Sequence, residues 1–393
     1  MKKILYTLLI FSTTTISAQG KKFFKNGEVQ LQNPVEKINL RYSNNMPFVQ
    51  VSINGKPYNF LFDTGAPTVI STAVYTELGL EKKHTGKVKD SQKNKQEQIF
   101  TVLPEMTIDR AVFKDVGAIV MDFSVSELSC FKIDGIIGAN QMAKLFWKIN
   151  YAENSLEASK DLAAFNPADY DIVIPFSPRI QKTPVIEIEL QGKKMALTFD
   201  TGFSGRLKIA DNAYDIQKAS SSIEVYGTSS VGAFGAGKPA PGHIFRTADL
   251  SLGNKNFSNE IIATGNANLI GNDFFKNFVF VLDWSANMIY MKRINNEPAR
   301  LESFGFGYRF IDEKPTVTFV FREENYPLKV GDAIISINNV DLDHLDKDSA
   351  CHYFLNRVEN GQSAIDLKIR RDGKEMQVRV EKKEFLGINS LSA

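Results

Sequence analysis

Two stretches of the chain carry the same pattern of apolar and polar residues in the same register. Residues 47–65 read P-F-V-Q-V-S-I-N-G-K-P-Y-N-F-L-F-D-T-G, and residues 184–202 read P-V-I-E-I-E-L-Q-G-K-K-M-A-L-T-F-D-T-G. Apolar and polar residues alternate before the Gly-Lys pair of each stretch, as they do in a half-buried strand. The Asn-Gly at 54–55 and the Gln-Gly at 191–192 suit tight turns. Each stretch therefore predicts a β-hairpin whose second, apolar strand runs into Asp-Thr-Gly.

The two copies also match further along the chain. Ile-Ile-Gly at 136–138 corresponds to Leu-Ile-Gly at 269–271, and a polar residue followed by an aromatic one comes 12 residues after each of these glycines. Turn signals separate short strand patterns throughout both copies. A repeat of this kind predicts one structural unit that is present twice. We therefore expect an all-β fold with two duplicated lobes, residues 19–170 and residues 171–295.

Asp63 and Asp200 occupy equivalent positions in the two copies and are the candidate catalytic residues. One Asp-Thr-Gly by itself is most simply a polar turn after a strand, with local hydrogen bonds to the aspartate and a glycine at positive φ. Here that explanation must hold twice, each time with a matching strand downstream. The repeated motif therefore favours a catalytic role of the two aspartates over a purely structural turn. Two carboxyl groups within about 3 Å share one proton and can activate water for attack on a carbonyl.

On these motifs the sequence resembles the pepsin/retropepsin clan of aspartic peptidases, especially exported bacterial members, over about residues 40–292. The resemblance implies an aspartic-type endopeptidase, a hydrolase, whose two Asp-Thr-Gly loops meet at a pseudo-two-fold axis at the bottom of a cleft. It implies that Thr64 and Thr201 hydrogen-bond across this axis, and that Gly65 and Gly202 donate N–H groups to the carboxylates. A peptide or protein substrate is expected, with no cofactor and no metal. The alternative is a catalytically inactive peptide-binding or scaffold protein that keeps the fold.

Both loops depart from the pepsin pattern at the residue after Gly. Pepsin-like members usually place a hydroxyl there that hydrogen-bonds a catalytic oxygen, whereas this chain has Ala66 and Phe203. Without that bond an ionised carboxylate is less stabilised. We therefore expect pKa values of the aspartate pair above those of pepsin, and an activity optimum at mildly acidic to near-neutral pH. Tyr226, Gly227 and Thr228 resemble the pepsin flap and are the candidate flap residues, although they lie in the second copy.

The remaining segment, residues 296–393, resembles a PDZ domain. Residues 331–338 read G-D-A-I-I-S-I-N, like the core motif of that family, and residues 345–358 predict an amphipathic helix. The resemblance implies a groove for a peptide or protein chain end, bound as an added strand. The candidate groove residues are Phe304, Gly305, Phe306 and Gly307. A domain that only packs on the peptidase is the alternative.

Because both copies of the repeat are complete by about Arg293, we expect the two lobes to fold without residues 298–393. The two cysteines, Cys130 and Cys351, fall in different predicted domains. A cross-link between them is compatible with an oxidising compartment, but the sequence favours two buried free thiols. A monomer is expected.

The N-terminus predicts export. Lys2 and Lys3 precede a short apolar run at residues 4–11, and a small, polar stretch ends near Ala18. This is the layout of a secretory signal peptide, residues 1–18, cleaved near Ala18, so we expect a periplasmic or extracellular protein. No segment reaches the length of a membrane span. The net charge of +2, from 47 basic and 45 acidic residues, gives no reason to expect nucleic-acid binding.

Overall fold

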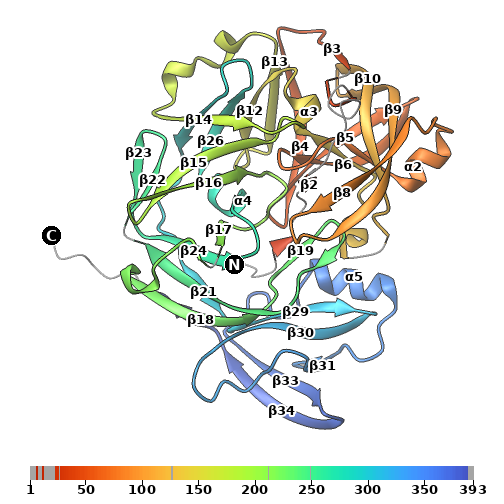
Figure 1. Cartoon of the computed structure of the whole chain (residues 1–393). Coiled ribbons are helices and arrows are strands. Elements are labelled where there is room, and N and C mark those ends of the chain that lie inside the picture. The colour runs from red at the N-terminus through yellow and green to blue at the C-terminus, as the bar shows by residue number, and fades with distance from the viewer. Residues whose placement is uncertain are drawn as a thin grey trace.

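The computed structural model describes residues 6–7, 11–12, 23–25, 27–124, 127–210, 212–247 and 249–387. This part of the chain is mostly β-strand, which confirms the predicted all-β class. The predicted signal peptide and its cleavage site lie outside the described residues, apart from the short strands β1 (Tyr6–Thr7) and β2 (Phe11–Ser12). The chain has three parts: a first half up to residue 170, a second half from residue 171 to residue 295, and a C-terminal segment from residue 296 (Figure 1).

The first half is built from hairpins around a buried apolar core. Strands β5 (Met46–Ile53) and β6 (Lys56–Asp63) are joined by Asn54 and Gly55, whose φ values of 51° and 76° suit these two residue types. Strand β11 (Gly135–Gly138) pairs in parallel with β6, and Gly138 lies opposite Asp63. The other elements are β3 (Glu28–Gln30), β4 (Val35–Ser43), β7 (Val69–Ser71), α2 (Thr72–Glu77), β8 (His84–Asp90), β9 (Lys95–Ile108), β10 (Ala111–Met121), η1 (Glu127–Phe131), α3 (Ala139–Met142), β12 (Phe146–Asn150), β13 (Ser155–Ser159), η2 (Leu162–Phe165) and η3 (Pro167–Asp169).

The second half uses the same pairings around its own Asp-Thr-Gly. Strands β15 (Pro184–Leu190) and β16 (Lys193–Phe199) form a hairpin that turns at Gln191 and Gly192, with φ values of 54° and 74°. Strand β25 (Leu269–Ile270) pairs in parallel with the end of β16. The other elements are β14 (Ile172–Pro178), β17 (Leu207–Ala210), η4 (Ile216–Lys218), β18 (Ser221–Gly227), β19 (Ser230–Gly232), β20 (Gly235–Ala236), β21 (Ala240–Thr247), β22 (Leu250–Leu252), β23 (Lys255–Phe257), β24 (Glu260–Gly265), α4 (Asn272–Phe275), β26 (Phe278–Asp283) and β27 (Met288–Arg293).

One sheet joins the two halves. Its strand order is β4–β13–β12–β26–β27–β14, so each half supplies three strands, and the antiparallel pair β12–β26 lies at the centre. A single cluster of buried apolar side chains extends through both halves, from Val29 to Met291. Because the halves share a sheet and a core, their two Asp-Thr-Gly loops are held at a fixed separation.

The C-terminal segment has a hydrophobic core of its own, centred on Tyr308, Val317 and Ile337. The helix expected at residues 345–358 is found as α5 (Lys347–Leu355), and the side chain of Asp346 caps its first turn by accepting from the N–H of Ser349. The strands are β28 (Leu301–Ser303), β29 (Phe306–Ile311), β30 (Lys314–Phe321), β31 (Ala333–Ile337), β32 (Val340–Asp341), β33 (Ala364–Arg371), β34 (Lys374–Glu381) and β35 (Lys383–Phe385).

This segment is joined to both halves. Strand β30 pairs with β18 of the second half, and apolar residues from both form a further buried cluster. The buried guanidinium of Arg246 donates to the carbonyl oxygens of Ala299 and Leu386. A disulfide links Cys130 of the first half to Cys351 of α5. The expectation of two free thiols is therefore wrong, because the fold brings together two cysteines 221 residues apart.

Candidate active site

Asp63 and Asp200 come at the ends of the two equivalent strands. Asp63 is the last residue of β6, and Asp200 directly follows β16. Each strand lies between its hairpin partner and a parallel strand, so no edge of it is open where the aspartate emerges. Both side chains are fully buried. An unpaired carboxylate would be costly in such a place.

Reciprocal hydrogen bonds between the threonines lock the two loops together. Thr64 Oγ1 donates to the carbonyl oxygen of Phe199 at 2.6 Å and accepts from the N–H of Thr201 at 3.0 Å. Thr201 Oγ1 likewise donates to the carbonyl oxygen of Phe62 at 2.7 Å and accepts from the N–H of Thr64 at 2.9 Å. All four bonds are buried, so they fix the loops, and with them the aspartates, relative to each other.

The glycines after the threonines leave room for the opposite carboxyl group. A Cβ atom on Gly65 would lie 2.5 Å from Oδ1 of Asp200, and one on Gly202 would lie 2.3 Å from Cγ of Asp63. Neither carboxyl group could give way, because both are enclosed. The same glycines donate their N–H groups to the aspartates of their own loops, Gly65 to Asp63 Oδ1 at 2.7 Å and Gly202 to Asp200 Oδ1 at 2.8 Å.

The two carboxyl groups lie within hydrogen-bonding reach of each other. Among the described residues, no N–H or O–H group donates to Oδ2 of either one. A proton held between them supplies the missing donor, and two carboxylates this close cannot both stay ionised. Burial raises the pKa of Asp63 to about 7, although hydrogen bonds from Asp200 and Gly65 lower it. Burial, followed by the negative charge of Asp63, raises the pKa of Asp200 well above its ordinary range.

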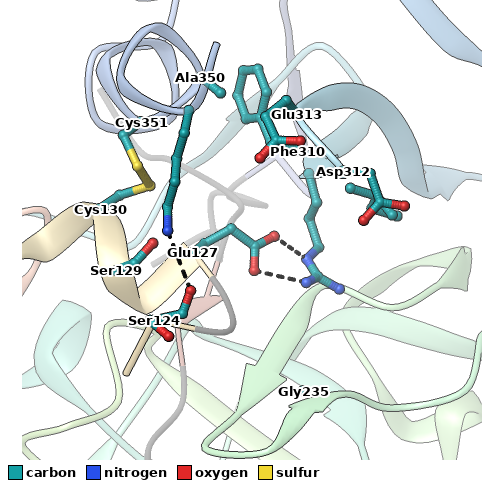
Figure 2. Close-up of a pocket in the computed structure, with 13 residues that line it drawn as sticks. Ser124, Glu127, Ser129, Cys130, Gly235, Phe310, Asp312, Glu313, Ala350 and Cys351 are labelled. Atoms are coloured by element: carbon teal, nitrogen blue, oxygen red, sulfur yellow. Dashed lines mark hydrogen bonds and ion pairs between the residues drawn. A yellow bond between two sulfur atoms is a disulfide. The ribbon is translucent and has the colours of Figure 1, made fainter. Parts of the chain in front are cut away.

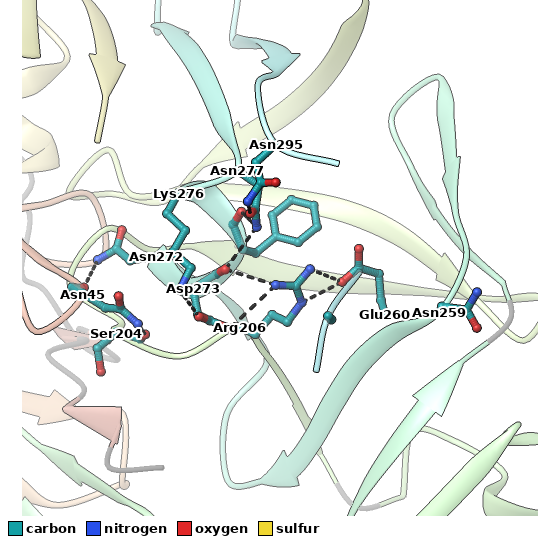
Figure 3. A network of polar contacts seen from close by, with 12 residues as sticks. Asn45, Ser204, Arg206, Asn259, Glu260, Asn272, Asp273, Lys276, Asn277 and Asn295 are labelled. Carbon is teal, nitrogen blue, oxygen red and sulfur yellow. Dashed lines mark hydrogen bonds and ion pairs between the residues drawn. The ribbon is translucent and has the colours of Figure 1, made fainter. Parts of the chain in front are cut away.

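A polar network beside the second loop centres on Asn272, the first residue of α4 (Figure 3). Its Nδ2 group donates to the carbonyl oxygens of Thr201 at 2.6 Å and Asn45 at 2.8 Å, and its Oδ1 accepts from the hydroxyl of Tyr151 at 2.9 Å. The Nδ2 group of Asn45 donates to the carbonyl oxygen of Ser204 at 3.1 Å. Because Asn45 and Tyr151 belong to the first half, Asn272 connects both halves to the second loop.

Ion pairs hold α4 in place next to this network. Arg206 lies 2.6 Å from Glu260 and 3.6 Å from Asp273, and Lys276 lies 2.6 Å from Asp273 (Figure 3). Sequence reasoning missed all of these residues and Asn272. The one available signal for Asn272 was its position directly after Gly271 of the repeated motif.

The predicted flap residues contact the C-terminal segment. Tyr226 and Gly227 pair with Val320 and Phe319 of β30, and the ring of Tyr226 lies under the guanidinium of Arg322. A Cβ atom on Gly227 would come within 2.1 Å of a β30 carbonyl oxygen, which explains the glycine. Thr228 also belongs to this contact, since its N–H donates to β30 at 2.8 Å.

The chain beyond Thr228 reaches the first half. The N–H of Phe234 donates to Oδ2 of Asp90 at 2.9 Å, and the amide of Gln92 donates to the hydroxyl of Ser230 at 3.2 Å. Asp90 ends β8 and Gln92 lies in the β8–β9 turn. The tips of two hairpins, one from each half, therefore touch, and the sequence identified neither contact.

The candidate groove residues of the C-terminal segment lie at the start of β29. The side chains of Phe304 and Phe306 are buried in the core of this segment. The N–H of Gly305 donates to the hydroxyl of Ser303, and the carbonyl oxygen of Phe304 accepts from the hydroxyl of Tyr326. Gly307 pairs with Phe319 of β30. These contacts all lie within the C-terminal segment.

Residues 49–141 match the family model of aspartyl proteases. This match covers the first Asp-Thr-Gly and the strand that pairs with it, and it supports an aspartyl protease family and protease activity. No curated protein matches the chain. In the part of the chain that the structure describes, no helix is both long and apolar enough to span a membrane.

Proposed function

We propose that this chain is an aspartic endopeptidase in which Asp63 and Asp200 form the catalytic pair. The observation that carries the proposal is the pair itself: two fully buried carboxyl groups within hydrogen-bonding reach, on loops joined by reciprocal threonine hydrogen bonds. A structural turn needs neither the second carboxyl group nor the raised pKa values. Perturbed, mutually coupled acids of this kind are typical of catalytic sites.

The chemistry follows from one shared proton. The ionised member of the pair takes a proton from a water molecule, while the protonated member donates to the oxygen of the scissile carbonyl. Attack of the water on the carbonyl carbon gives a tetrahedral gem-diol. Transfer of a proton to the amide nitrogen then releases the amine product and returns the pair to its starting state. The proton belongs to the pair, so neither aspartate is fixed as acid or base.

We also propose the surrounding organisation of the chain. Two duplicated lobes, residues 19–170 and 171–295, are supported by the equivalent pairings β6–β11 and β16–β25 and by the shared sheet. A PDZ-like domain at 296–393 is supported by the order of its strands and by α5 next to the edge strand β29. We further propose secretion through the signal peptide at residues 1–18, which suits the disulfide.

Single substitutions of the pair test the function. Asp63→Asn and Asp200→Asn should each abolish cleavage of a denatured protein while leaving the circular dichroism spectrum unchanged. Asp283→Asn is the matched control, because Asp283 is also buried but, among the described residues, accepts from its own turn: from the N–H groups of Ser285 and Ala286 and from the hydroxyl of Ser285. Substantial activity in either of the first two variants would refute the shared pair. A wild-type protein that binds peptides but never cleaves them would instead favour the inactive scaffold.

A further inference from the structure

The C-terminal segment is attached to the hairpin that reaches the first half. Strand β18, which starts this hairpin, pairs with β30 from Val225 to Gly227. Within three residues the chain enters β19, whose Ser230 contacts Gln92 of the first half. We call residues 221–247, the β18–β21 hairpin with its tip at 230–236, the second-half flap. Residues 225–227, which we call the flap base because the tip projects beyond them, can therefore move only together with β30.

The same segment is attached a second time, to η1 of the first half. Arg309 of β29 makes two hydrogen bonds to the carboxylate of Glu127, at 2.6 and 2.8 Å, and both side chains are about nine-tenths buried. The ring of Phe131 meets that of Phe354 edge to face. The Cys130–Cys351 disulfide closes this contact (Figure 2).

Together, the two attachments make the C-terminal segment a bridge between the halves. On one side it carries the second-half flap, and on the other it is covalently bound to η1. Strand β6, which carries Asp63, is connected to η1 through β11. This strand begins four residues after Phe131, pairs with β6 and ends opposite Asp63. The flap base and β30 can therefore leave the first half together only if η1 separates from α5, and the disulfide prevents that.

The disulfide lies in a cavity of about 370 Å³ between α5, η1, the end of β29 and the flap tip at Gly235 (Figure 2). Both cysteines are only partly buried and line this cavity. Glu313 and Lys347, at its rim, are exposed and polar, so water and a small reductant can enter. A structural disulfide in a closed core would not be reached in this way.

We propose that the Cys130–Cys351 disulfide is a reducible clasp, through which the C-terminal segment holds the second-half flap against the first half and restricts entry to the cleft. The inference rests on the proposed peptidase function. In the disulfide-bonded form only the flap tip can move, so the cleft admits short peptides or extended chains with small side chains. In the reduced form the flap base is released as well, and bulkier polypeptides enter.

The reductant is a dithiol. One of its thiolates attacks a sulfur of the disulfide, the S–S bond breaks, and a mixed disulfide forms as the other cysteine leaves as a thiolate. The second thiol of the reductant then displaces the remaining cysteine and the reductant departs as its own disulfide. Two electrons pass to the protein, and its two cysteines end as thiols with the two protons that the dithiol gave up.

Hydrogen exchange tests the clasp without using activity. The full chain is compared before and after complete reduction with dithiothreitol, with reduction verified by thiol titration. We expect faster exchange in residues 230–237 on reduction, because their contacts with Asp90 and Gln92 of the first half are lost, and unchanged exchange in residues 225–227, which stay paired with β30. The Cys130→Ser/Cys351→Ser variant should show fast exchange in residues 230–237 before the reductant is added, and no change afterwards. Ser129 lines the same cavity, but Ser129→Ala keeps the disulfide, so this variant should behave as wild type. Unchanged exchange in fully reduced wild-type protein would overturn the proposal, even if the double variant does not fold.

Cleavage measurements then test the effect on entry. Reduction should raise kcat/KM for a denatured protein by about fivefold or more, which is the lower end of the usual coupling between two sites. The kcat/KM for a short peptide should stay nearly unchanged. Faster flap exchange with both rates unchanged would refute the control of entry. The exchange arm is repeated in Asp63→Asn. If this variant still cleaves, the proposed catalytic pair fails, while its response to reduction still decides the clasp.

Discussion

Removing one carboxyl group of the buried pair should stabilise the protein at neutral pH. The folded state raises the pKa of Asp63 from 3.8 to about 7, and raises that of Asp200 as well. In the unfolded chain both groups ionise near pH 4, so between about pH 4 and pH 7 the folded state binds more protons than the unfolded state. The free energy of unfolding of the wild type must then fall as pH rises through this window. Asp200→Asn takes one of the two proton-binding groups away.

The size of the effect follows from the shift. One pKa unit corresponds to about 1.4 kcal/mol, so the rise of the Asp63 pKa from 3.8 to about 7 corresponds to about 4 kcal/mol. Wild type and Asp200→Asn should have similar stability near pH 3 and diverge as pH rises to 7, where the variant should be the more stable by an amount of this order. Urea unfolding at several pH values, with the disulfide intact, measures the difference. Parallel stability curves from pH 4 to pH 7 would refute the buried pair with raised pKa values.

Three further predictions concern other parts of the molecule. Deleting residues 298–393 should yield an insoluble or unfolded protein in a solubility and circular dichroism assay, because it uncovers the apolar cluster shared with β18 and strips the buried Arg246 of its partners on Ala299 and Leu386; a soluble, folded core would restore the expectation of separable lobes. Asn272→Asp should lower kcat with little change in KM, and the loss should grow as pH rises, because an ionised carboxylate repels the carbonyl oxygens of Thr201 and Asn45. Asn277→Ala is the control, because the described bonds of its side chain are with Asp273, Phe274 and Asn295 and not with the second loop. A ratio between the kcat values of the two variants that does not change with pH would contradict this role. The pH profile of kcat/KM should peak between mildly acidic and neutral pH and move lower in Ala66→Ser, which adds a hydroxyl beside the pair; a wild-type optimum below about pH 3 would mean a pair stabilised as strongly as that of pepsin.

The sequence was informative wherever one local pattern determined the structure. Asn54-Gly55 and Gln191-Gly192 specify their hairpins by conformational preference alone, and the structure has both turns where expected. The repeat placed Asp63 and Asp200 in equivalent positions, because a duplicated pattern predicts a duplicated neighbourhood. The class of fold and the helix α5 followed from the same kind of signal.

What the sequence did not predict depends on contacts between distant segments. Tyr226 has the composition of a flap residue, but its neighbours are set by the pairing of β18 with β30, almost a hundred residues later. Nothing near Cys130 indicates that Cys351 will face it. Phe203 was expected only to lack a hydroxyl, yet its ring packs on Leu269 in a small buried cluster. A Phe203→Ser substitution would therefore leave a cavity as well as add a hydroxyl, which makes Ala66 the better position for testing the pH optimum.

The two attachments of the C-terminal segment differ in the kind of bond they use. This difference determines which of the two attachments a reductant can break. Between β18 and β30 the contact consists of main-chain hydrogen bonds and buried apolar side chains such as Val225 and Phe321, and neither responds to a reductant. Between η1 and the C-terminal segment the contact consists of one covalent S–S bond, one buried ion pair with Arg309 of β29, and the edge-to-face packing of Phe131 on Phe354. Breaking the covalent bond leaves the ion pair, whose net stabilisation is small once its desolvation is counted, and one edge-to-face ring pair, which contributes about 1 kcal/mol. Reduction should therefore release η1 while β30 stays on the flap, so the C-terminal segment and the flap should move away from the first half as one body.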